Sequence, residues 1–182
     1  LMWSDALHSY PLFTAHHRIP RASIGPELEE RPIPLMAPSK RFNVAGLRCA
    51  FAIIPNAELR SHYKEGRDLV GYPNLMGYTA ARAAYLKGEP WLNALRRYLT
   101  TNRQVMTTYI EESMPEIKVA PPEGMYLAWL DCRTLDLEPS PHRFFLENAR
   151  VALNNGAAFG PGGEGFVRLN FGCPQAQLLK GL

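Results

Sequence analysis

A lysine stands directly after an apolar segment of strand length in the run Ile33-Pro34-Leu35-Met36-Ala37-Pro38-Ser39-Lys40-Arg41-Phe42-Asn43-Val44-Ala45-Gly46-Leu47-Arg48. The apolar segment, residues 33–37, predicts a strand with both faces covered. A charged amine beside such a strand is unfavourable when buried, because desolvation penalises an ammonium far more than an uncharged imine. Chemistry that removes the charge would explain Lys40.

Two interpretations of Lys40 are open. In the first, Lys40 condenses with an aldehyde such as that of pyridoxal 5′-phosphate (PLP), and Arg48, eight residues further on, binds the phosphate. In the second, Lys40 is a strand-end lysine that extends its ammonium into solvent, as most lysines do. Composition alone favours the second interpretation.

The composition is that of an ordinary globular protein. The 182 residues are 46% hydrophobic and 20% charged, which is enough to bury a core as one domain or as two small ones. A net charge of +3 with scattered arginines argues against a nucleic-acid partner. No apolar run approaches the ~20 residues of a membrane span, and the N-terminus lacks the pattern of a signal peptide. We therefore expect a cytoplasmic protein with no membrane partner.

Cysteines and histidines predict neither a disulfide framework nor a metal site. Cys49, Cys132 and Cys173 are odd in number and widely spaced, so we expect reduced, small core residues. The five histidines include no pair at the spacing of a helical or hairpin metal site.

Apolar patterns in the first part of the chain predict an α/β core. Residues 1–7 and 47–55 read as further strands, and residues 26–30 begin a short helix with proline in first position. Residues 75–87 predict a helix that Gly88-Glu89-Pro90 breaks. A helical stripe then marks a long connecting helix, and its members are Leu92, Leu95, Leu99, Met106 and Ile110.

A small α+β domain is predicted for residues 113–182, after a large-domain portion at residues 1–112. Strands at residues 125–133 and 166–171 surround a helix at residues 141–149. A glycine-rich turn precedes the second of these strands. In that strand the period of two places Val167, Leu169 and Phe171 on one face and Arg168 with Asn170 on the other.

Four separated blocks follow one another in a set order: Ser4-Asp5-Ala6-Leu7-His8, then Ala37-Pro38-Ser39-Lys40 with Phe42-Asn43-Val44-Ala45-Gly46-Leu47, then Glu123-Gly124-Met125-Tyr126-Leu127-Ala128-Trp129-Leu130-Asp131-Cys132-Arg133, and finally Gly165-Phe166-Val167-Arg168-Leu169-Asn170. Together they resemble PLP-dependent enzymes of fold type I, the aspartate aminotransferase superfamily. The chain is most similar to the cystathionine β-lyase branch of MalY/PatB type. This resemblance covers nearly the whole chain and implies a PLP-binding α/β large domain, a small C-terminal domain and a homodimer.

The resemblance implies a role for each matching residue. Lys40 would bond to the cofactor aldehyde and, once freed by substrate, would take the substrate's α-proton. Asp5 would keep the pyridine nitrogen of the cofactor protonated. The other implied positions are His8 near the phenolic oxygen, Ser39 and Arg48 at the phosphate, and Arg168 at the substrate α-carboxylate.

Each of these residues also has an ordinary structural interpretation. Asp5 would be a loop residue or helix cap, and His8 a hydrogen-bonded structural histidine. Arg48 would be a surface arginine at a strand edge. Ser39 would bond within its own turn, and Asn170 would be purely structural.

The resemblance departs from the family pattern in two ways. Ala6 and Arg41 stand where the family commonly has Glu and Thr, and neither change removes a catalytic group. The family's glycine-containing phosphate loop, its ring-stacking aromatic residue and an asparagine near the phenolic oxygen would all precede Leu1. We therefore expect a C-terminal portion of a longer enzyme, which by itself binds PLP weakly or not at all.

The implied activity is that of a carbon–sulfur β-lyase, which converts an S-substituted cysteine, a small-molecule amino-acid substrate, into a thiol, pyruvate and ammonia. An aminotransferase of class I/II would use the same lysine, aspartate and arginines, so it remains an alternative. A third alternative is that the chain is an inactive fragment without its cofactor cradle.

Overall fold

A computed structural model describes residues 2–5, 13, 25 and 32–182. The chain divides into two compact units, Leu1–Leu95 and Arg96–Leu182. The division falls within the long helix α4 (Glu89–Ser113). The helix start predicted at residues 26–30 lies outside the described residues. The predicted domain boundary after residue 112 stays a prediction.

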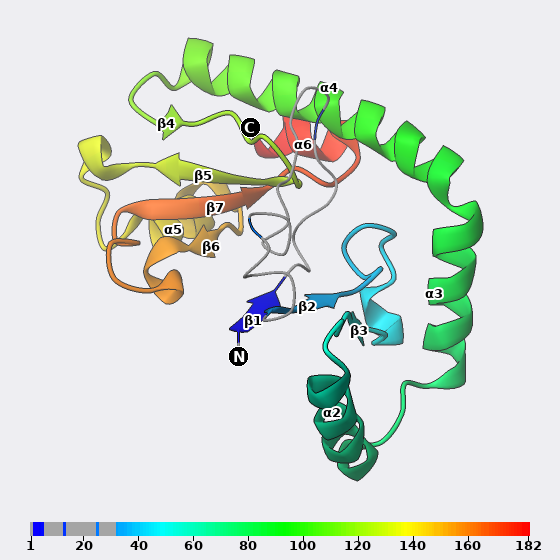
Figure 1. Ribbon diagram of the computed structural model, residues 1–182. Helices are drawn as coiled ribbons and strands as arrows, with labels where there is room; N and C mark the ends of the chain where they lie inside the picture. The colour runs from blue at the N-terminus through cyan, green and yellow to red at the C-terminus, as the bar shows by residue number, and fades with distance from the viewer. Residues whose placement is uncertain (1, 6–12, 14–24, 26–31) are drawn as a thin grey trace. The chain divides into compact units, whose positions relative to one another are not determined.

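A three-stranded sheet is present among the described residues of the first unit (Figure 1). β1 (Met2–Asp5) pairs in parallel with β2 (Pro32–Met36), and β2 pairs antiparallel with β3 (Phe51–Ala52). Parallel neighbours require a crossover connection, as in α/β proteins. The strand predicted at residues 33–37 is confirmed as β2, with the side chain of Ile33 buried.

The strand predicted at residues 47–55 is wrong in extent. Only Phe51–Ala52 form β3, because Ala45–Leu47 form a 3-10 turn, η2, and Arg48 ends that turn in the left-handed region, with φ 49° and ψ 54°. A left-handed residue turns the backbone away from the extended direction that a strand ladder needs. An apolar run therefore becomes a loop followed by a two-residue strand.

Helix α2 (Ala57–Val70) follows β3 and is absent from the sequence-based prediction. The side chain of Asn56 caps it by accepting a hydrogen bond from the Leu59 N–H at 3.0 Å. The Arg60 guanidinium donates to the Ile54 carbonyl at 2.8 Å and ties the first turn to the end of β3. The described side chains of α2 are exposed or half-buried, and the helix contains few apolar residues. The asparagine cap was the signal available in the sequence.

Two helices meet at Gly88, where the break was predicted. Only this residue separates α3 (Leu75–Lys87) from α4, and Glu89 already begins α4. The buried ring of Phe42 packs against Gly88, since a Cβ there would lie 2.6 Å from Phe42 Cε1. Tyr85 meets the same ring edge-on with 5.6 Å between centroids, and Trp91 stacks on it at 6.2 Å. Gly88 thus leaves room for an aromatic anchor close to Lys40.

An antiparallel sheet organises the second unit. The strands predicted at residues 125–133 and 166–171 are confirmed as its two longer members. Two-residue strands lie on either side of this pair, and they are too short to show a sequence period. The order is β4 (Lys118–Val119), β5 (Leu127–Asp131), β7 (Phe166–Asn170) and β6 (Asn154–Asn155).

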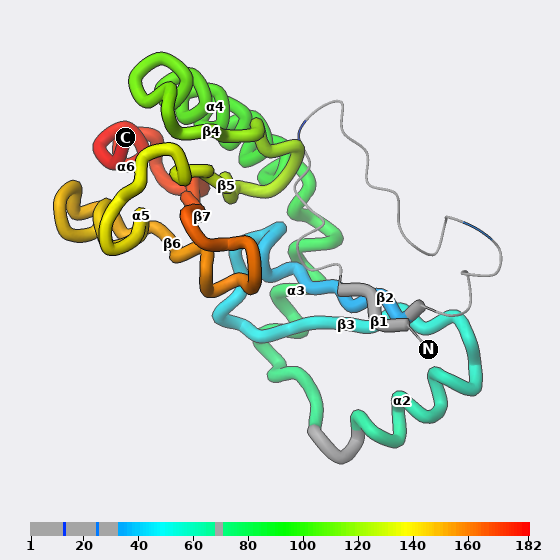
Figure 2. Tube along the Cα trace, turned by 90° about the vertical axis from the view of Figure 1, so that its left-hand side faces the viewer, coloured from blue at the N-terminus to red at the C-terminus, as the bar shows by residue number. Residues whose placement is uncertain are grey.

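The helix predicted at residues 141–149 is confirmed. α5 (Pro141–Phe144) continues into a π-helical turn, η4 (Phe145–Ala149), over the predicted helix at residues 141–149. α6 (Gln175–Gly181) lies next to α4 (Figures 1 and 2), and the Gln175 N–H donates to the Tyr98 hydroxyl at 2.7 Å. The predicted glycine turn before β7 is also confirmed, with positive φ at Gly160, Gly162 and Gly165.

Apolar faces fall where the periods predict them. In β7 the side chains of Val167 and Leu169 are buried, as is Phe171 directly after it, whereas Arg168 is half-buried and Asn170 exposed. Along α4 the stripe is buried at Leu92, Leu99, Met106 and Ile110, and Leu95 is half-buried.

Asn102 is a fully buried polar residue on the apolar stripe of α4. Its Nδ2 donates to the carbonyl of Phe171 at 3.0 Å and to that of Cys173 at 2.8 Å. These two bonds tie α4 to the chain segment that leaves β7. A carbonyl that leaves water on folding destabilises the protein unless it finds another hydrogen-bond donor. The Asn102 amide supplies that donor.

We expect Asn102→Ala to lower the free energy of unfolding by about 2 kcal/mol, because two carbonyls lose their donor in a buried place. Thr101→Ala is the matched control, since Thr101 lies one residue away and is exposed. Urea denaturation measures both variants. A loss for Asn102→Ala no larger than that for Thr101→Ala would contradict this account.

We expect Gly88→Ala to destabilise the protein by about 1–3 kcal/mol, because the new methyl group overlaps the Phe42 ring and the Ala84 carbonyl. Gly66→Ala should instead stabilise it by roughly 0.5–1 kcal/mol, because alanine favours the helix. Gly66 lies within α2, and among the described residues no atom outside its own helix backbone and chain neighbours is within 4 Å of its Cβ position. In thermal unfolding, Gly88→Ala should lower the Tm and Gly66→Ala should raise it if this packing is correct.

Candidate active site

The carboxyl ends of β1 and β2 meet at one edge of the first sheet. Asp5 is the last residue of β1, and its Cα is paired with that of Leu35 in β2. β2 ends at Met36, and Lys40 follows shortly after it in a turn. This edge is where α/β sheets ordinarily bind ligands. The backbone at Asp5 and the turn of Lys40 therefore belong to the same edge.

A tight turn carries Ser39 and Lys40. The Phe42 N–H donates to the Pro38 carbonyl at 2.8 Å, and the Val44 N–H donates to the Ser39 carbonyl at 3.0 Å. Pro38 and Phe42 are buried, whereas Ser39 and Lys40 are half-buried. The buried residues hold the backbone and leave the Lys40 amine within reach of a ligand, as reaction with an aldehyde requires.

Arg48 lies in the same loop, between η2 and β3, and its side chain is exposed. Its own N–H donates to the Ala45 carbonyl at 3.1 Å. An exposed guanidinium on a fixed backbone suits a phosphate, because its planar fork of donors matches the phosphate oxygens.

Two predicted cofactor residues are only partly covered by the structure. His8 lies outside the described residues, and Asp5 is placed by its backbone alone. Their roles stay predictions.

Arg168 occupies the middle of β7 in the second unit. Its neighbours across the sheet are Trp129 in β5 and Asn154 in β6. Its Nε and Nη2 donate to the Asn154 Oδ1 at 3.3 and 3.1 Å, and its guanidinium lies 4.5 Å from the centre of the Phe159 ring. An amide oxygen and an aromatic face together set the direction of this cation.

Sequence reasoning missed Asn154 and Phe159. Asn154 belongs to a two-residue strand, and Phe159 ends the 3-10 turn η5 (Gly156–Phe159), so neither has a periodic signal. The Asn170 Oδ1 accepts a hydrogen bond from the Gly172 N–H at 2.9 Å, which agrees with a structural role for Asn170.

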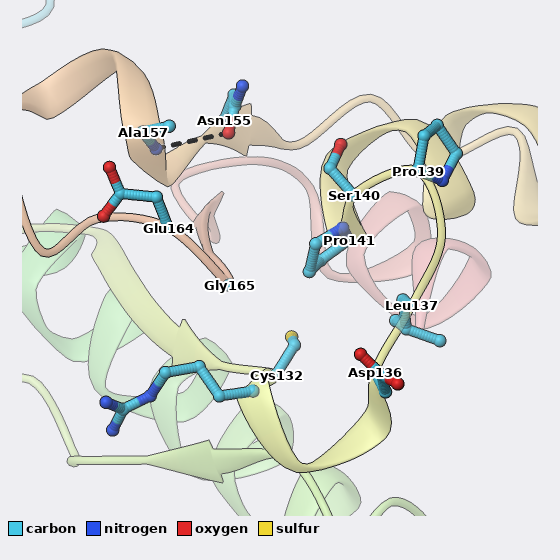
Figure 3. Close-up of a pocket in the computed structure, with 11 residues that line it drawn as sticks. Cys132, Asp136, Leu137, Pro139, Ser140, Pro141, Asn155, Ala157, Glu164 and Gly165 are labelled. Atoms are coloured by element: carbon cyan, nitrogen blue, oxygen red, sulfur yellow. Dashed lines mark hydrogen bonds between the residues drawn. The ribbon is translucent and has the colours of Figure 1, made fainter.

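A separate hollow of about 420 Å³ lies in the second unit and contains none of the predicted site residues (Figure 3). Figure 3 shows the sulfur of Cys132 pointing into it, with Pro141 facing that sulfur. Arg133 also lines it, but its guanidinium pairs with Asp131 at 2.7 Å and lies 4.7 Å from the Phe166 ring centre. The hollow offers no convergent set of polar groups that would define a ligand.

Burial raises the pKa of the Cys132 thiol from 9.0 to about 11, and the nearby Asp131 carboxylate adds to this shift. The folded state therefore binds the proton more tightly than the unfolded state. The resulting stabilisation is fully present below pH 9 and is lost as the pH rises towards 11.

We expect the free energy of unfolding of the wild type to fall by about 1–2 kcal/mol more than that of Cys132→Ala between these pH values. The two proteins are compared by how steeply their free energy of unfolding falls with pH. The cavity left by the substitution lowers this free energy equally at each pH, so it does not change the slope. Parallel curves for the two proteins would show that the thiol does not carry the effect.

The described residues hold no group of three or more His, Cys, Asp or Glu side chains that could bind a metal ion. Within the same residues, no helix has both the length and the apolar character needed to cross a membrane.

The chain matches a known family of proteins. The family described as "Aminotransferase class I and II" matches residues 24–182, so the chain belongs to this family. The chain is 36% identical to "Cystathionine beta-lyase PatB" of Bacillus subtilis (strain 168) over 182 residues, which are 98% of the chain and 47% of that protein. It is 40% identical to "Protein MalY" of Escherichia coli (strain K12) over 152 residues, which are 81% of the chain and 39% of that protein. The predicted resemblance to this branch is thereby confirmed.

Solved structures give the same result for the fold. Cystalysin from Treponema denticola, which contains pyridoxal 5′-phosphate, matches with a TM-score of 0.93 and 30% identity over 100% of this chain and 47% of its own. The PLP-bound C–S lyase from Staphylococcus hominis matches with a TM-score of 0.90 and 32% identity over 98% of this chain and 47% of its own. The predicted α/β fold of the PLP-dependent class is confirmed. The chain spans about half the length of the curated relatives that it matches.

Proposed function

We propose that the protein carrying this chain is a PLP-dependent carbon–sulfur β-lyase that acts on S-substituted cysteines. The observation that supports it best is the loop between β2 and β3. It carries the Lys40 amine and the Arg48 guanidinium at the sheet edge where β1 ends with Asp5. Similarity to proteins named cystathionine β-lyase supports the choice of reaction within the family.

The donor set in this loop fits PLP. When bound, PLP supplies an aldehyde to an amine and a ring that accepts electrons from the substrate's α-carbon. Lys40 is a half-buried amine on a rigid turn, which suits the aldehyde. Arg48 and the Ser39 hydroxyl suit the phosphate, and the Asp5 carboxylate suits the protonated ring nitrogen. His8 would lie near the phenolic oxygen.

Lys40 also acts as the base of the proposed reaction. Its amine, once released by the substrate amino group, takes the proton from the substrate's α-carbon. The thiolate then leaves from the β-carbon with the electron pair of the carbon–sulfur bond. Water completes the conversion of the remaining fragment into pyruvate and ammonia, so a thiol, pyruvate and ammonia are the products.

Arg168 holds the substrate carboxylate in this proposal. A guanidinium binds a carboxylate through two parallel hydrogen bonds, which orients the α-hydrogen for removal. Asn154 and Phe159 restrict the rotation of Arg168, so less freedom is lost when substrate binds.

The second candidate is an aminotransferase. A PLP-bound putative aminotransferase from Clostridium difficile 630 matches the chain with a TM-score of 0.92 and 35% identity over 98% of this chain and 47% of its own. An aminotransferase would use the same residues of this chain, but it would need a keto acid as acceptor.

We further propose a cytoplasmic homodimer, as the resemblance to fold type I enzymes implies.

We expect the intact natural protein to convert cystathionine into homocysteine and pyruvate without any added keto acid. Lys40→Ala should lower the rate by at least roughly 10²–10⁴-fold, because both the covalent amine and the base are lost. Lys64→Ala is the control, since Lys64 is an exposed lysine of α2. Pyruvate assay and thiol titration measure the products. Turnover that requires a keto-acid acceptor would instead establish the aminotransferase.

A further inference from the structure

The residue that caps the N-terminus of α3 is hydrogen-bonded to the peptide group that precedes Arg48. We propose that Asn74 and Gly77 form a clamp on the Leu47 carbonyl that sets the direction of the Arg48 side chain. Asn74 is thus a positioning residue for the cofactor phosphate. The inference rests on the proposed function, in which Arg48 binds that phosphate.

Asn74 uses both ends of its amide. Its Oδ1 accepts a hydrogen bond from the Gly77 N–H at 2.7 Å and thereby caps α3. Its Nδ2 donates to the Leu47 carbonyl at 2.8 Å, across 27 residues of sequence. The helix cap holds the side chain in one orientation, so the donor is already aimed at the loop.

Gly77 allows the loop to approach this closely. It is buried, and a Cβ at this position would overlap the Leu47 carbonyl oxygen. The same Cβ would come within 3.2 Å of Asn74 Nδ2 and 3.3 Å of Cys49 Cβ. A side chain here would therefore displace the loop from the helix.

The clamp acts on the peptide group between Leu47 and Arg48. The carbonyl end of this group is bound to Asn74, and the N–H end, which belongs to Arg48, donates to the Ala45 carbonyl at 3.1 Å. With both ends held, the plane of the peptide cannot rotate. This constraint maintains the left-handed φ of 49° at Arg48, a conformation that a residue with a side chain adopts only when its surroundings impose it.

The residue after Arg48 is also held, because Cys49 is buried against Gly77. Arg48 is thus an exposed side chain between two fixed neighbours. A guanidinium that starts from a fixed Cα loses less freedom when it binds a phosphate. The clamp therefore acts on the affinity for the phosphate group, without touching the ligand.

The test uses the intact natural protein, freed of cofactor and titrated with PLP. Asn74→Asp keeps the oxygen that caps α3 but replaces the donor with an oxygen that repels the Leu47 carbonyl. Asn56→Asp is the matched control, because Asn56 caps α2 in the same way. Gly77→Ala disturbs the clamp by a second route, and Gly66→Ala is its control within a helix.

We expect Asn74→Asp and Gly77→Ala to raise the Kd for PLP by about tenfold, and Arg48→Ala to raise it at least as much. The two controls should stay within about twofold of wild type. Pyridoxal, which lacks the phosphate, should bind to Asn74→Asp as it binds to wild type. Adding Asn74→Asp to Arg48→Ala should change the Kd little further, because the clamp acts through the arginine.

The rate of hydrogen exchange at the Arg48 amide measures how firmly the clamp holds this peptide group, without any ligand. We expect the exchange to be faster in Asn74→Asp than in Asn56→Asp. An unchanged Kd for PLP in Asn74→Asp, beside a raised Kd in Arg48→Ala, would overturn the clamp and leave the proposed function standing. Equal PLP affinity of wild type and Arg48→Ala would contradict the phosphate role itself, and the positioning inference would fall with it. If Asn74→Asp weakened the binding of pyridoxal as much as that of PLP, the substitution would have damaged the whole site, and the positioning inference would be wrong.

Discussion

The burial of Phe42 is the interaction on which the first unit's site depends. The ring occupies a space that Gly88 leaves open, between Tyr85 and Trp91. Because the ring is fixed by packing, the turn that contains Lys40 has little freedom. The amine that we propose reacts with the cofactor therefore starts from a fixed backbone at the sheet edge. A polar site is thus positioned by an apolar contact two residues away, which needs no hydrogen bond to the reacting group.

Asparagine amides extend this organisation into both units. Asn74 joins α3 to the loop of Arg48, Asn102 joins α4 to the segment after β7, and Asn154 joins β6 to Arg168. Asn74 and Asn102 donate to backbone carbonyls, which an aspartate would repel, and the amide oxygen of Asn154 accepts from the guanidinium. In each case a functional or connecting segment is held by a neighbour on another element.

Much of the fold could be predicted because its signals are local. Apolar runs marked β2, β5 and β7, Gly88 marked the end of α3, and the apolar stripe marked α4. The failures have equally local reasons. Residues 47–55 are apolar enough for a strand, but the left-handed backbone at Arg48 shortens it to β3. Helix α2 has charged residues along most of its length and was missed although Asn56 caps it.

The sequence by itself determined which residues carry the proposed chemistry. Lys40, Arg48 and Arg168 lie in short sequence blocks. The order and spacing of these blocks are apparent in the amino-acid sequence, because each block is a single loop or strand. Only the tertiary structure decided how the backbone before Arg48 and the side chain of Arg168 are held. The bonds that do so join residues 27 and 14 positions apart, from Asn74 to Leu47 and from Arg168 to Asn154. No periodic pattern encodes such pairs, since their partners become neighbours only after helices and strands have packed.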